Sequence, residues 1–268
     1  MSNPVFKTKK SPLRGYKLDS NESFASKHGM PNGVVAAPPE PMTIGDVLNK
    51  TLVMFLVVLS GVALSIGGLI VGGLGLVSVM LTVSAGLSIV LGLVLAFKRK
   101  PSPVLTTLYS VAMGTFTGSM SLVLEAQFDG IILQAVGATL VVFLTVLVLF
   151  RSGKIRATPN LTKFFIVATV AYSAFAILNY FLMLFGATDS MFGLRTEFSP
   201  WIGIAIGALA VLLATYSLIL DFTFIQEGVS RGVDKKYSWY AAFGLVMTIV
   251  WLYIEILRII AIVRSMAD

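Results

Sequence analysis

Long apolar stretches separated by short polar segments occupy most of the chain after residue 42. An α-helix rises about 1.5 Å per residue, so about 20 apolar residues cross the hydrocarbon core of a bilayer. Pro103 and Pro200 open two of these stretches, and proline suits a first helical turn because the N–H that it lacks would have no partner there. The pattern predicts an all-α bundle of seven transmembrane helices, at about residues 46–68, 72–97, 103–124, 130–151, 161–185, 200–226 and 239–263.

The first two predicted helices are nearly continuous in sequence. Only a short stretch around Ile70 and Val71 separates them. A single helix of about 50 residues would be roughly 75 Å long, which is far more than the thickness of a bilayer. We therefore expect two helices joined by a tight hairpin.

The segment 1–41 differs in kind from the membrane domain predicted for residues 42–268. It is polar and basic, contains several prolines and has few large apolar residues, so we expect a disordered cytoplasmic tail. It lacks the apolar core and the cleavage site of a signal peptide, so the first long apolar stretch should insert and remain. The letters T-I-G-D at 43–46 predict a capping box at the start of the first helix, in which the Thr43 and Asp46 side chains bond early backbone N–H groups.

Composition and charge agree with a membrane protein. Hydrophobic residues make up 56% of the chain and charged residues 12%, which is rare in a soluble domain. Lys and Arg in short loops stay on the cytoplasmic side, and here they fall in alternate connections, with only Arg195 and Arg264 on the other side. We expect a multi-pass cell-membrane protein with its N-terminus in the cytoplasm and its C-terminus outside. The inner basic residues are Lys50, Lys98, Arg99, Lys100, Arg151, Lys154, Arg156, Lys163, Arg231, Lys235 and Lys236.

The chain lacks the residues that several kinds of chemistry require. The chain has no cysteine and a single histidine, His28, which lies in the tail, so thiolate sites and histidine-based metal clusters or catalytic pairs are excluded. Its glycine-rich stretches lie in apolar helices and not at a strand-to-helix turn, so we expect no nucleotide-binding loop. We expect no enzymatic activity and no cofactor. The net charge of +7 reflects membrane topology and does not indicate nucleic-acid binding.

Three ionisable residues fall within the last two apolar helices, namely Asp221, Glu255 and Arg258. A charge at this depth costs about 2.5–3.5 kcal/mol even on the lenient insertion scale, so each residue is a functional candidate. Glu255 and Arg258 are three positions apart and can neutralise each other. Asp221 has no such local partner, although it lies near enough to the inner boundary to reach water. Carboxylates in such surroundings can exchange protons near neutral pH and can bind a hard cation through oxygen.

Four segments resemble the transmembrane Bax inhibitor motif family, particularly its bacterial and actinobacterial members. They are P-S-P-V-L-T-T-L-Y from Pro101, G-I-I-L-Q-A-V from Gly130, L-D-F-T-F-I around Asp221, and W-L-Y-I-E-I-L-R around Glu255. The resemblance extends over about residues 42–263. It implies a seven-helix fold with the last helix at its centre.

The same resemblance implies a pH-sensitive calcium leak across the membrane. In that family two acids in the last two helices share a proton and gate the pore, and the matching positions here are Asp221 and Glu255. A cation near the inner end of the second helix latches the acid pair in the closed state, for which Lys98 and Arg99 are candidates by position. No firm metal site is implied, only transient calcium near the two acids.

Helix geometry leaves open whether the two acids meet. Glu255 lies about 24 Å along its helix from Trp239, whereas Asp221 lies about 8 Å from Gln226. The two acids meet only if the inner ends of the last two helices project beyond the membrane by about two turns.

Our first functional hypothesis is a calcium leak in contact with the lipid bilayer, calcium and protons. The alternatives are a proton-coupled transporter of a small solute, and a non-transporting membrane adaptor whose basic tail recruits a membrane or cytoplasmic protein.

Overall fold

The structure, a computed structural model, describes residues 40–97 and 103–267. Nearly all of the predicted tail therefore lies outside the described residues. Within them the fold is all-α, as predicted, and six helices are long and apolar enough to cross a membrane. They are α2 (Ile44–Phe97), α3 (Pro103–Glu125), α4 (Ile131–Arg151), α5 (Pro159–Leu184), α6 (Pro200–Ser230) and α7 (Ser238–Ser265), with two short 3-10 helices, η2 (Gly193–Arg195) and η3 (Lys235–Tyr237).

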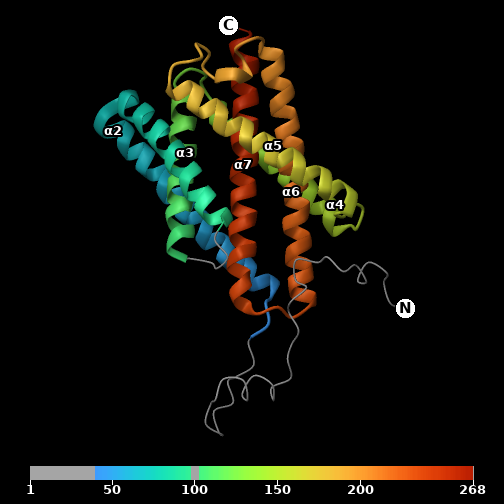
Figure 1. Cartoon of the computed structure of the whole chain (residues 1–268). Coiled ribbons are helices and arrows are strands. Elements are labelled where there is room, and N and C mark those ends of the chain that lie inside the picture. The colour runs from blue at the N-terminus through green and yellow to red at the C-terminus, as the bar shows by residue number, and fades with distance from the viewer. Residues whose placement is uncertain (1–39, 98–102, 268) are drawn as a thin grey trace.

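The prediction of seven separate helices was wrong in its count, because the first two belong to one 54-residue element, α2. Only Gly73, with φ 63° and ψ −163°, leaves the helical conformation inside it. The chain nevertheless turns back at this glycine. A side chain at Gly68 would collide with Met80, although the two would be about 18 Å apart in a straight helix. Figure 1 shows the two resulting arms of α2, residues 44–72 and 74–97, lying side by side.

Local signals in the sequence correctly marked several helix starts. Pro103 and Pro200 begin α3 and α6, and the Ser199 hydroxyl accepts a hydrogen bond from the Trp201 N–H. The Thr43 Oγ1 atom accepts from the Asp46 N–H at 3.1 Å, while the Asp46 carboxylate accepts from the Thr43 N–H at 3.3 Å. This reciprocal pair is the predicted capping box.

Helix α7 packs against α2, α3, α4 and α6 and lies at the centre of the bundle (Figure 1). Leu252, Leu257 and Ile262 are among its fully buried residues. This is the central position expected for the last helix. Helix α5 differs, because it crosses the bundle diagonally and Asn179 is its one buried residue.

Small residues bring the first arm of α2 into backbone contact with α3. A side chain at Gly114 would collide with the Val58 carbonyl, and one at Gly61 with the Val111 carbonyl. The buried Ser65 hydroxyl donates to the Thr115 carbonyl at 2.9 Å. Lipid gives no hydrophobic driving force for helix association, so close packing and polar contacts hold these two helices together.

The residues before α2 are attached to the connection between α6 and α7. The Met42 N–H donates to the Val233 carbonyl at 2.7 Å, and the Lys235 N–H donates to the Glu40 carbonyl at 2.8 Å. The Met42 side chain is only 2% exposed. The start of α2 is therefore tied to the connection that leads into the central helix α7.

We predict that Gly114→Ala destabilises the protein by about 1–3 kcal/mol, because the added methyl group meets backbone that cannot move without separating α2 from α3. Gly137→Ala in α4 is the matched control, because a Cβ there has no neighbour within 4 Å. Thermal unfolding in detergent should show a lower midpoint for Gly114→Ala alone. Equal midpoints for the two variants would contradict the close α2–α3 contact.

Candidate functional site

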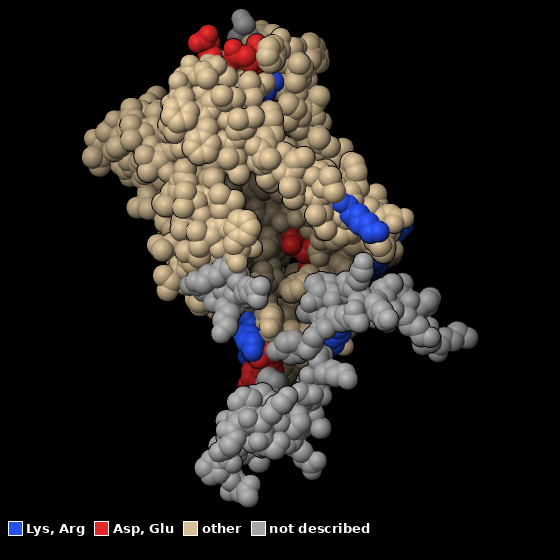
Figure 2. All heavy atoms as spheres, viewed as in Figure 1, with Lys and Arg blue, Asp and Glu red and all other residues tan. Residues whose placement is uncertain are grey.

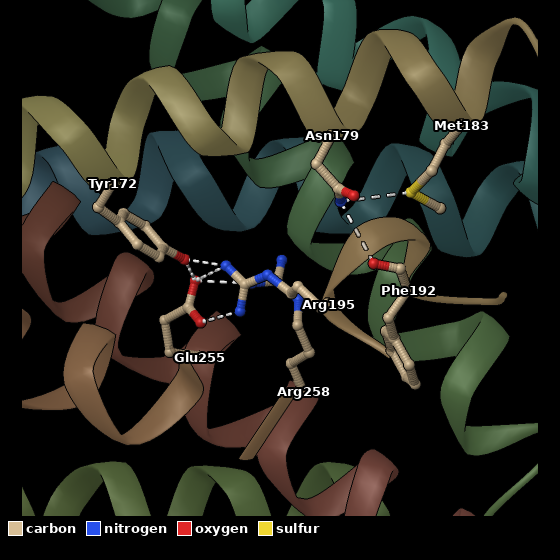
Figure 3. Close-up of polar contacts among 7 residues, drawn as sticks. All are labelled: Tyr172, Asn179, Met183, Phe192, Arg195, Glu255 and Arg258. Carbon is tan, nitrogen blue, oxygen red and sulfur yellow. Dashed lines mark hydrogen bonds and ion pairs between the residues drawn. The ribbon is translucent and has the colours of Figure 1, made fainter. Parts of the chain in front are cut away.

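Glu255 of α7 is the centre of a buried ion cluster (Figure 3). The Arg195 Nη1 atom lies 3.0 Å from Glu255 Oε2, and the Arg258 Nη1 atom lies 2.6 Å from Oε1. The Tyr172 hydroxyl donates to the same carboxylate and accepts a hydrogen bond from Arg195. Glu255 is 2% exposed and Arg195 3% exposed, so this network replaces water as the partner of the charges.

The members of the Glu255 cluster come from three separate elements. Arg258 lies one turn after Glu255 on α7, so helical spacing alone brings these two together. Tyr172 lies midway along α5, and its ring packs 5.9 Å from the ring of Trp251. Arg195 is the last residue of η2, in the connection between α5 and α6.

Asn179 holds the η2 connection in place. Its Oδ1 atom accepts from the Leu194 N–H at 2.7 Å, and its Nδ2 atom donates to the Phe192 carbonyl at 3.3 Å (Figure 3). Gly193, between them, has φ 61°, which glycine adopts without strain. A side chain at Gly193 would also collide with Asn179. Thus α5 supplies Tyr172 to the cluster directly and positions Arg195 through Asn179.

The charges of the Glu255 cluster do not cancel. Two guanidinium groups surround one carboxylate, which leaves a net positive charge inside the bundle. Rings stabilise the Arg195 guanidinium further, since it lies 5.3 Å from the centre of the Tyr172 ring and 5.9 Å from that of Phe175. Removing one partner from such a buried network leaves the others uncompensated, at a cost of about 3–5 kcal/mol.

Asp221 of α6 occupies a different environment. A Cβ at Gly244 of α7 would lie 3.2 Å from Asp221 Oδ1, and the Thr248 side chain is a hydrogen-bonding neighbour. The Oδ2 atom is buried and has no hydrogen-bond partner among the described residues. Figure 2 shows one acidic side chain recessed in a hollow of this face, with a basic side chain on the surface to its right.

The structure does not bring Asp221 and Glu255 together. Asp221 faces Thr248, which precedes Glu255 by seven residues on α7 and therefore lies about 10 Å from it along the helix axis. The hydrogen bonds and ion pairs of Glu255 within the described chain go to Tyr172, Arg195 and Arg258. The two acids are thus separate sites in this conformation. Lys98 and Arg99 lie outside the described residues.

Arg195 and Tyr172 are the members of the cluster that the sequence did not predict. Arg195 counted only as one of two basic residues on the outer side, and Tyr172 only as a polar atom within the bundle. That rarity of basic residues on the outer side was the one available signal for Arg195. Among the described residues, no group of three or more His, Cys, Asp or Glu could hold a metal ion.

Comparison with known protein families identifies the family of this chain. The family model described as Bax inhibitor 1 like matches residues 3–265. The chain is a multi-pass membrane protein that belongs to this family. No curated protein matches the chain.

We predict that Glu255→Gln lowers the free energy of unfolding by about 3–5 kcal/mol, because Arg195 and Arg258 both lose the carboxylate with which they pair. Asp221→Asn removes a carboxylate that makes no ion pair among the described residues, and we expect a change within about 1 kcal/mol. Thermal unfolding followed by tryptophan fluorescence ranks the two variants. Equal destabilisation would mean that the Glu255 cluster contributes no more than the isolated acid.

Proposed function

We propose that the protein is a calcium-permeable leak in the cell membrane whose flux depends on pH through Asp221 and Glu255. The observation that carries the proposal is the arrangement of these acids along the central helix α7, which carries Glu255 and against which Asp221 of α6 packs. Asp221, which has no cation partner among the described residues, lies about two turns along α7 from Glu255, which two arginines hold. Membership of the Bax inhibitor 1 like family is consistent with this activity.

The two acids have different roles in this proposal. Asp221 offers oxygen atoms to a proton or to a hard cation such as calcium. Glu255 is already neutralised by its arginines, and the net positive charge around it opposes cations in the present arrangement, which we assign to the closed state. Flux then requires Glu255 to separate from at least one arginine, and protonation of Asp221 removes the charge that attracts a cation toward the cluster.

We also propose that the N-terminus lies in the cytoplasm and the C-terminus outside. Each arm of α2 exceeds the about 20 residues that a bilayer requires, so the chain crosses seven times if both arms span it. Asp221 then lies nearer the inner face, where α6 ends at Ser230. Arg195 enters the bundle from the outer face.

Calcium flux into proteoliposomes between pH 6 and 8 tests this proposal. Asp221→Asn mimics the protonated acid, so its flux should stay at the level of the parent at pH 6 across the whole range. Glu227→Gln is the matched control, because this partly exposed residue of α6 pairs with Arg231 at the helix end and its loss changes the net charge equally. Glu255→Gln, once folding is confirmed, should reduce flux at least about fivefold because the cluster becomes more positive.

Other outcomes identify other functions. An Asp221→Asn variant that keeps the full pH dependence would contradict the role of this acid. Saturable uptake of a defined solute with the same acid dependence would identify a proton-coupled transporter. No flux in any folded variant would contradict the leak and favour an adaptor, whose function would depend on the tail at 1–41.

A further inference from the structure

We propose that the connection between α5 and α6, residues 185–199, is a latch that closes the Glu255 cluster from the outer side and opens as a unit. We call this segment the outer latch. Arg195 fastens it to Glu255, and Asn179 fastens it to α5. The role in flux rests on the proposed calcium leak, whereas the movement of the latch can be measured without any flux.

The position of Arg195 in the chain supports an opening movement. Glu255, Arg258 and Tyr172 belong to long helices and cannot leave the bundle without moving those helices. Arg195 belongs to a three-residue 3-10 helix in a connection between two helices. Such a connection can move away while the helices on both sides remain intact.

The outer latch has its own internal contacts. The Ser190 hydroxyl bonds to that of Thr196, and the Ser190 N–H donates to the Glu197 carboxylate at 3.3 Å. These contacts keep residues 190–197 together as one unit. The polar contacts from this unit to the helices converge on Asn179 and on the pair of Tyr172 and Glu255.

The outer latch makes close contact with α6 and α7. A Cβ at Gly203 would lie 2.8 Å from Thr196 Cγ2, 3.0 Å from Ile262 Cδ1 and 3.1 Å from the Arg195 carbonyl oxygen. The latch backbone therefore rests where Gly203 leaves room beside the outer half of α7. Ile262, which is 0% exposed, lies beside Gly203 at this contact.

Opening the outer latch changes the charge that a cation meets. With Arg195 in place the cluster is net positive, which opposes an approaching calcium ion. Without Arg195, the pair of Glu255 and Arg258 is neutral and the Tyr172 hydroxyl remains beside it. The latch thus closes the cluster both by covering it and by adding a positive charge.

A single cysteine can report the opening directly, because the chain contains none. We would introduce Ile262→Cys and measure its reaction with a hydrophilic maleimide in nanodiscs, where both faces are accessible. Adding Arg195→Gln or Asn179→Ala should speed labelling about tenfold or more, because each removes a buried attachment of the latch. Arg195→Lys, which keeps the charge but lacks the guanidinium fork, should give an intermediate rate.

Arg264→Gln is the matched control for the labelling experiment. Arg264 lies near the outer end of α7 and donates to the Asp129 carbonyl at 2.9 Å, in the connection between α3 and α4. Its loss removes the same charge and should leave the labelling rate unchanged. If Arg195→Gln and Asn179→Ala, folded as judged by their unfolding midpoints, label no faster than this control, the outer latch is contradicted.

Calcium flux of the same variants without the reporter cysteine separates this inference from the proposed function. Faster labelling together with raised flux at pH 8 supports both. Faster labelling without flux in the parent or in any variant supports the latch and contradicts the leak. If the variants label faster but their calcium flux equals that of a parent that leaks, the latch opens without controlling permeation, and its proposed role in flux is contradicted.

Discussion

A carboxylate buried in the central helix is the constraint on which much of this structure depends. Glu255 cannot remain charged among apolar helices without cations close by, and one helix turn supplies only Arg258. The second cation, Arg195, must come from outside the spanning helices. Three features bring Arg195 to Glu255. They are the tight turn at Gly193, the space at Gly203 and Asn179, the one buried residue of α5.

The two sides of α7 are held by different kinds of interaction. On one side, α2 and α3 meet backbone to backbone at Gly61 and Gly114, with no charged group in the contact. On the other side, α5 contributes little buried surface and is joined to the rest by the polar groups of Tyr172 and Asn179. Dense packing resists deformation, whereas a few polar contacts exchange readily. Movement is therefore expected at α5 and at the outer latch.

The separation of Asp221 from Glu255 gives the protein two acidic sites instead of one. Asp221 lies beside Gly244, and its buried Oδ2 atom has no hydrogen-bond partner among the described residues. Under the proposed function, Asp221 responds to protons or cations on its own, whereas Glu255 responds only when an arginine moves. Under the proposed orientation, the first acid is the nearer to the cytoplasm and the second is governed from outside.

The sequence by itself determined the features that depend on neighbouring residues or on depth in the membrane. Local geometry predicts the helix starts at Pro103 and Pro200 and the capping box. The cost of burying a charge makes Asp221 and Glu255 functional candidates. Tertiary structure decided the rest. The connection between α6 and α7 sets the axial offset of these two helices, which keeps Asp221 and Glu255 apart. The diagonal course of α5 brings Tyr172 and Arg195 to Glu255. No spacing in the chain encodes these contacts, because they depend on how separate helices cross.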